Sequence, residues 1–110
     1  MKNINLVDDN EEHMELLIGQ NQKENDQLVR SSHPMDLWFH LDDISSPHFI
    51  LRCNGKSVTK TQLKYIASLF SQYKKGLGRR YKVIYTEIKN VKLTKTLGTV
   101  VPSQLRVVRV

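Results

Sequence analysis

The chain has few of the residues and segments on which several protein classes depend. Its single cysteine, Cys53, cannot form a disulfide within the chain or a zinc site built from several cysteines. No apolar run approaches the roughly 18 to 20 residues that a membrane-spanning helix needs. The N-terminal stretch MKNINLVDDNEEH is acidic and lacks the apolar segment of a secretory signal peptide. We therefore expect a cytoplasmic protein in a reducing compartment.

Acidic residues are nearly absent from the second half of the chain. Residues 49–110 contain fourteen Lys and Arg and one acid, Glu87, for a net charge of +13. Residues 1–48 contain three basic and ten acidic residues, for a net charge of −7. Such asymmetry favours one surface that attracts polyanions, and nucleic acid is the polyanion that a clustered basic surface usually binds.

The remaining composition is that of a folded protein with a modest core. Hydrophobic residues make up 39% of the 110 residues and charged residues 25%, as in ordinary globular domains of this size. We predict a single domain over residues 1–110.

The first third of the chain predicts two short strands and a helix. The strands span residues 4–7 and 14–19, with the polar stretch DDNEEH connecting them as a hairpin. A short helix runs from residue 21 to about residue 30. Asn21 is its expected N-cap, with a glutamate three residues later in the capping-box position.

A hairpin is predicted next. In LWFHL (37–41), Trp38 and His40 alternate with three apolar residues, so the two sets lie on opposite faces of a strand. After the turn ISSP, the segment HFILRC (48–53) supplies the antiparallel partner. The apolar face consists of Leu37, Phe39 and Leu41.

The second half predicts a longer helix and further strands. Helical spacing extends from Thr59 to Lys75, and the basic loop KGLGRR (75–80) ends it. The segments YKVIYTEI (81–88), TVVP and LRVVRV read as strands. We predict an α+β fold, a largely antiparallel sheet with one longer and one short helix, and we expect both helices on one side of it. The apolar stripe of the longer helix is Leu63, Ile66, Ala67 and Phe70.

A concentration of Asp and His in residues 35–49 suggests metal chemistry. On a strand, Asp36, His40 and Asp42 share a face and offer the carboxylate and imidazole ligands of a metal-dependent nuclease. However, no recognised metal-ligand spacing accompanies them, and no nucleophile elbow surrounds the nearby serines. We therefore expect no catalytic residue, metal or cofactor, and keep the nuclease as an alternative.

Two groups of basic residues are the expected nucleic-acid contacts. Glycine-containing KGLGRR suits contacts to backbone phosphates without sequence readout. Tyr73, Tyr81 and Tyr85 interleave with the first group and offer rings for stacking on unpaired bases, although core or sheet positions are at least equally consistent with Tyr81 and Tyr85. The first basic cluster is Lys74, Lys75, Arg79, Arg80 and Lys82, and the second basic cluster is Lys89, Lys92 and Lys95.

The order of three motifs resembles one known family. The segments IGQNQKENDQLVR, DLWFHLDDISSPHFILR and VIYTEIKNVK are similar to the NFACT RNA-binding domain (NFACT-R) across residues 14–95. That domain occurs in the C-terminal part of ribosome quality control factors and in small stand-alone proteins. The motif positions are Gly19, Asn21, Asn25, Asp26, Asp36, Trp38, Phe39, His40 and His48, followed by Tyr85, Thr86, Lys89, Val91 and Lys92.

The resemblance implies RNA binding rather than a reaction. Its expected partners are ribosomal or transfer RNA, and with them the ribosome, in translation or ribosome quality control. One departure is Ser46-Pro47, where many members have Gly-Ser before the second histidine. We expect a minimal stand-alone version of the module. DNA as the ligand, and a protein-docking adaptor that uses the acidic half, remain alternatives.

Overall fold

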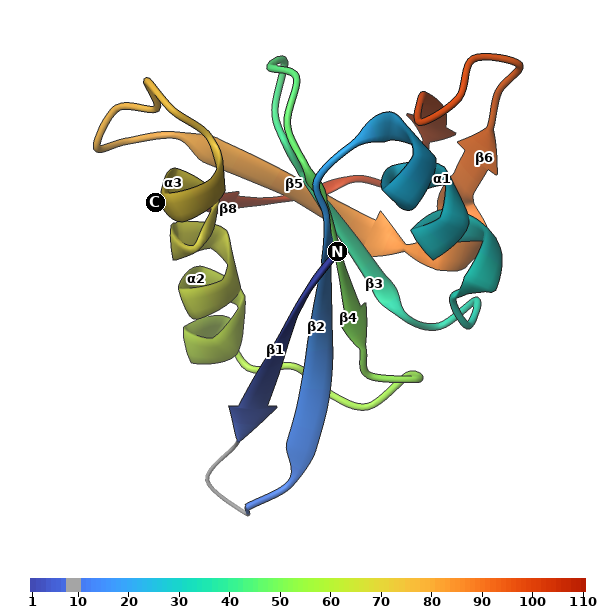
Figure 1. Cartoon of the computed structure of the whole chain (residues 1–110). Helices are drawn as coiled ribbons and strands as arrows, with labels where there is room; N and C mark the ends of the chain where they lie inside the picture. Colours follow the sequence, from blue (N-terminus) through green and yellow to red (C-terminus); the bar gives the residue numbers. More distant parts are fainter. Residues whose placement is uncertain (8–10) are drawn as a thin grey trace.

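The computed structural model describes residues 1–7 and 11–110, so the predicted DDNEEH connection lies partly outside the described residues. The fold is α+β, as predicted: a six-stranded antiparallel sheet in the order β1-β2-β4-β3-β5-β8, a separate β6-β7 pair, and helices on the sheet (Figure 1). The elements are β1 (Lys2–Val7), β2 (His13–Gly19), α1 (Gln22–Ser31), β3 (Leu37–Leu41), β4 (His48–Arg52), α2 (Lys60–Ser68), α3 (Phe70–Tyr73), β5 (Lys82–Glu87), the 3₁₀ turn η1 (Ile88–Asn90), β6 (Val91–Leu93), β7 (Val100–Pro102) and β8 (Arg106–Arg109).

Helix α1 begins where the sequence predicts. The Asn21 side chain accepts a hydrogen bond from the Glu24 amide at 2.9 Å, which confirms the N-cap. The Glu24 carboxylate reaches one residue further back than in a capping box, because it accepts from the amide of Gln20 at 3.0 Å. The chain's amino group also lies 2.7 Å from the Glu24 carboxylate, so β1 and α1 are joined at their N-terminal ends.

The predicted long helix is divided at Leu69 into α2 and α3. A complete capping box on Thr59 and Gln62 starts α2. At the break, the Leu69 amide bonds to the Ile66 carbonyl at 3.1 Å, in the tighter three-residue pattern. The Ser68 hydroxyl donates to a backbone carbonyl of the preceding turn, and such competition with the helix ladder bends helices. The predicted apolar stripe still faces inward over both helices.

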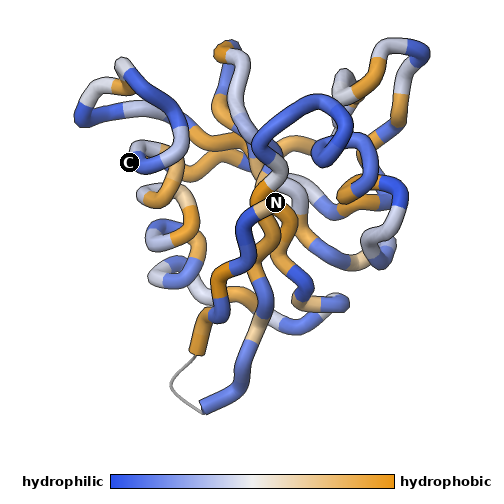
Figure 2. The backbone as a smooth tube through the Cα atoms, in the orientation of Figure 1, coloured by the Kyte–Doolittle hydropathy of each residue, from blue (hydrophilic) through white to orange (hydrophobic). Residues whose placement is uncertain are grey.

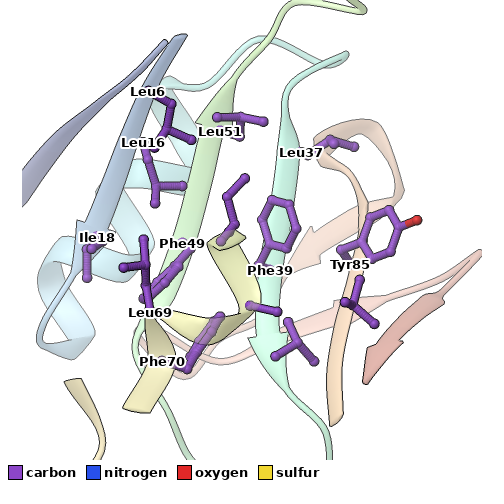
Figure 3. Packing of buried hydrophobic residues seen from close by; sticks show 14 of the residues in the cluster. Leu6, Leu16, Ile18, Leu37, Phe39, Phe49, Leu51, Leu69, Phe70 and Tyr85 are labelled. Atoms are coloured by element: carbon purple, nitrogen blue, oxygen red, sulfur yellow. The ribbon is translucent and has the colours of Figure 1, made fainter. Parts of the chain in front are cut away.

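The larger core cluster lies between the sheet and the pair α2 and α3. Phe49 of β4 stacks on Phe70 of α3 with ring centroids 3.8 Å apart, and Phe39 stacks on Tyr85 at 5.5 Å (Figure 3). The predicted apolar face of β3 packs into this cluster. The hairpin of β3 and β4 is confirmed by the pairing of Phe39 with Phe49.

The expectation that both helices cover one side of the sheet was wrong. Helix α1 packs on the opposite face, where Leu28 and Val29 contact a second cluster that includes Leu17, Trp38 and Ile50. Successive residues of a strand point to opposite faces, so β2, β3 and β4 bury apolar side chains on both. Figure 1 shows α1 and α2 on opposite sides of the central strands.

The short strands β6 and β7 complete the second cluster. Val91 pairs with Pro102 and Leu93 with Val100, and Val91 is buried against the α1 side of the sheet. The strand at 91–93 was not predicted, because three residues are too few for a periodic signal. Among the described residues, no helix is both long enough and apolar enough to cross a membrane.

Candidate nucleic-acid interface

Three motif residues meet where α1 crosses the ends of β2 and β4. Gly19 pairs with His48 across the sheet, and the His48 amide donates to Asn25 Oδ1 at 3.3 Å. A Cβ at position 19 would collide with that same Asn25 oxygen. The motif therefore specifies a close approach of helix to sheet, which requires glycine at one position and a buried amide at the other.

Trp38, His40 and His48 form a ring cluster beside this contact. The Trp38 indole Nε1 donates to His48 Nδ1 at 3.2 Å, so the His48 proton is on Nε2. The His40 ring stacks on Trp38 with centroids 5.5 Å apart and meets the edge of His48 at 5.1 Å. His40 Nδ1 lies 2.6 Å from the Leu41 carbonyl oxygen, to which it donates. Both imidazoles are thus fixed in orientation.

Burial keeps this cluster neutral. It lowers the pKa of His48 to about 4, and the neighbouring His40 adds to the effect. Burial also lowers the pKa of His40, and the hydrogen bond to the Leu41 carbonyl opposes that shift. At neutral pH neither ring carries the positive charge that would attract a phosphate. The cluster therefore offers shape and hydrogen bonds rather than charge.

The other buried motif residues hold loops and core in place. Asp36 is 3% exposed, and its carboxylate accepts from the amides of His33 at 2.9 Å and Asn54 at 3.0 Å. Asp26 pairs with Arg30 one helical turn later, at 2.6 Å. Phe39 lies on the α2 side, away from the ring cluster. These side chains are committed to internal partners.

The structure does not assemble the nuclease alternative. Asp36 and His40 are four strand residues apart, a separation of roughly 13 Å, and the Asp36 carboxylate is already bonded to two backbone amides. Asp42 lies beyond the end of β3. Within residues 1–7 and 11–110, no group of three His, Cys, Asp or Glu side chains is placed to hold a metal ion. The spacing that suggests a shared strand face does not bring these ligands to one point.

The basic residues lie in two patches rather than on one surface. The loop after α3, residues 74–81, and Lys82 carry the first basic cluster, of which only Lys74 is half-buried. Figure 2 shows this loop as predominantly hydrophilic. The second basic cluster occupies η1, β6 and the loop after β6. Strand β5 separates the two, and its six residues span roughly 20 Å.

The two patches differ in how far carboxylates neutralise them. Lys89 lies 3.1 Å from the Glu87 carboxylate, which also binds Arg106 at 3.3 Å. In the part of the chain that the structure describes, no member of the first basic cluster forms an ion pair. The first basic cluster therefore offers the stronger local field for an anion.

The comparison with protein families decides the assignment. Residues 5–104 match the family model for the NFACT protein RNA binding domain. The chain belongs to the NFACT RNA-binding domain family. Among curated proteins, none matches it.

A solved structure shares the fold of this NFACT domain. It is the C-terminal part of the fibronectin/fibrinogen-binding protein from Streptococcus suis, 22% identical, with a TM-score of 0.81. The match covers 100% of the present chain and 45% of the other, so the chain spans less than half the length of that structure. At this identity the likeness establishes the fold only.

The three tyrosines of this NFACT domain all pack against the core on the α2 side. Tyr85 is 9% exposed and stacks on Phe39, and the Tyr81 hydroxyl donates to the Ala67 carbonyl at 2.7 Å. Tyr73 packs its ring against the edge of Phe49. Tyr85 is therefore enclosed by the core, whereas Tyr73 and Tyr81 pack against the core and remain partly exposed.

Arg109 is the basic residue that sequence reasoning missed at this site. Strand β8 pairs with β5 so that Arg109 lies directly opposite Lys82, and both side chains are exposed. In the sequence the two are far apart, and LRVVRV reads as an ordinary strand. Arg106 and Arg109 are three residues apart and therefore point to opposite faces of a strand, so assigning Arg109 to this patch requires the strand pairing.

Proposed function

We propose that this domain is a non-enzymatic, single-domain RNA-binding module that contacts ribosomal or transfer RNA in the cytoplasm, in translation or ribosome quality control. Family membership supports RNA as the ligand class. The observation that carries the proposal for the site is the first basic cluster, which is exposed apart from the half-buried Lys74 and whose members have no carboxylate partner in the described residues. The second basic cluster provides further phosphate contacts at the other end of β5.

Phosphate contacts of this kind predict a strong salt dependence. Each cation that neutralises a phosphate releases counterions, with a slope of about −0.7 per contact for single strands. Five contacts from the first basic cluster give a slope of about −3.5 in log affinity against log salt concentration. Fluorescence anisotropy with a labelled RNA, titrated at several salt concentrations, measures this slope. Affinity that is independent of salt would contradict the proposal.

A pair of charge-reversal substitutions tests whether RNA binds at the first basic cluster. Arg79→Glu with Arg80→Glu should weaken RNA binding strongly without changing the thermal unfolding temperature, because both side chains are exposed in a loop. The matched control is Lys60→Glu with Lys64→Glu, which makes the same charge change on exposed positions of α2. Equal losses in the two pairs would indicate a general effect of net charge and not a site.

The cellular partner needs a separate experiment. Crosslinking in cells followed by sequencing of the bound RNA should enrich ribosomal or transfer RNA. Predominant recovery of other transcripts would contradict the translation context while leaving RNA binding intact. A DNA of the same sequence in the anisotropy assay tests the choice of polymer, since 2′-hydroxyl contacts distinguish RNA from DNA.

A further inference from the structure

Part of the sheet face that α1 covers is left open. Helix α1 and β6 lie over Trp38 and Ile50, toward the end of β5 away from the loop at 74–81 (Figure 1). Nearer that loop, three strands present one row of side chains on this face: His40 pairs with Ile84, and Ile84 pairs with Val107. Val107 is 50% exposed, and the other two are partly exposed. The row is an apolar and aromatic strip that no described element covers fully.

The next row of the same face is cationic. Lys82 and Arg109 are directly opposite each other, and both are exposed. Like charges in this position repel, so the pair is a local cost to the sheet unless an anion lies between the two side chains. Asp42 continues the row, since its amide donates to the Lys82 carbonyl at 3.0 Å. Within the described residues its carboxylate forms no ion pair with either cation.

We propose that an unpaired segment of RNA lies across β3, β5 and β8 on this face, with phosphates at Lys82 and Arg109 and bases over His40, Ile84 and Val107. The inference rests on the proposed RNA-binding function and deepens it, since it names the surface and the class of RNA. It also adds Arg109 to the contacts.

The juxtaposition of the two rows selects unpaired RNA. A phosphate needs a cation, while a base offers a flat face that stacks on aromatic and apolar side chains only when it is not enclosed in a duplex. Successive residues on one face of a strand are about 7 Å apart, so a base over Val107 lies next to a phosphate at Arg109. His40 is suited to such a contact because Trp38 and the Leu41 carbonyl fix its ring.

Removing the two cations should have a defined effect. Lys82→Gln with Arg109→Gln removes two phosphate contacts, which lowers the salt slope by about 1.4 and weakens binding roughly 20-fold at about 0.1 M salt. The probe is a labelled, unstructured RNA of about 16 nucleotides, the upper length that one small binding fold covers. Lys60→Gln with Lys64→Gln is the control of equal charge change, on α2, and should change affinity by no more than about twofold.

The outcomes separate this inference from the proposed function. If the wild-type domain binds with a steep salt dependence but the two double variants are equally affected, the surface is overturned and RNA binding stands. If the wild type binds neither the unpaired RNA nor its duplex with the complementary strand, the proposed function itself fails. Annealing the probe to its complement tests the class of RNA: weaker binding of the duplex supports the inference, and equal or tighter binding overturns it.

Photocrosslinking identifies directly the strands that the bases contact. A probe containing 4-thiouridine should crosslink through its bases to peptides of β8 and of β3 that contain Val107 and His40. Phosphate contacts alone would not place bases against these strands. Crosslinks confined to the loop between β6 and β7 would overturn the inference.

Discussion

Acidification should destabilise this domain through His48. The ring is 3% exposed and neutral, and burial, reinforced by His40, lowers its pKa from 6.5 to about 4. An unfolded chain takes up this proton as the pH falls through about 6.5, whereas the folded protein takes it up only near pH 4. Between these values the unfolded state binds more protons, so the free energy of unfolding decreases as the pH falls.

The size of the effect follows from the gap between the two pKa values. At about 1.4 kcal/mol per pH unit, His48 contributes about 3 kcal/mol that is present above pH 6.5 and lost by pH 4. This is a large share of the stability of a small domain. Urea unfolding followed by the fluorescence of Trp38, the only tryptophan, measures it at several pH values across this window.

The variant His48→Asn separates the effect of protonation from the effect of packing. Its side-chain oxygen replaces Nδ1 as the acceptor for the Trp38 indole, but it does not titrate. The variant is less stable than wild type at pH 7, and its stability should fall by about 3 kcal/mol less on the way to pH 4. Ile50→Val removes packing in the same cluster without a titrating group, costs about 0.5–1.5 kcal/mol, and should give a curve parallel to wild type. A parallel curve for His48→Asn as well would refute the buried neutral imidazole.

Two further substitutions test the packing and the charge of the sheet. Gly19→Ala should lower the free energy of unfolding by about 1–3 kcal/mol, because its methyl group collides with Asn25 Oδ1, while Gly78→Ala, in open space, should have little effect; thermal unfolding compares them. Lys82→Gln should raise the free energy of unfolding of the RNA-free protein by about 0.2–1 kcal/mol, because it removes the repulsion with Arg109, and a lower denaturation midpoint in urea would contradict the repulsive pair.

Local patterns predicted much of the fold because they depend on neighbouring residues. The N-cap at Asn21, the alternation of β3 and its hairpin with β4 follow from short-range chemistry, and the structure has them all. The side of the sheet that each helix covers does not follow from short-range chemistry. Both faces of β2 are apolar, since Leu17 is buried like Leu16 and Ile18. The sequence of β2 therefore does not indicate which face α1 covers.

The candidate site could not be predicted without knowing the order of the strands in the sheet. Lys82 and Arg109 become partners only because β8 returns to the edge of the sheet beside β5, a pairing between distant segments that no local signal specifies. The pairing of β3 with β5 places Tyr85 next to Phe39, in the core on the other face. The basic residues of the first basic cluster other than Lys74 are exposed, whereas the tyrosines between them could not be assigned to a face without the register.

The cluster that draws attention in the sequence has a role that its chemistry alone does not indicate. Asp, Trp and His within a few residues suggest catalysis, yet Asp36 is bound to two backbone amides and His48 to the Trp38 indole. Burial that neutralises both imidazoles also removes them as phosphate contacts. His40 therefore acts through its position. Its ring stacks on the buried Trp38, and His40 pairs with Ile84 in the partly exposed row of the sheet. The cluster therefore connects the family motif to the proposed RNA face through packing, and a substitution at Trp38 should disturb that face without removing any charge from it.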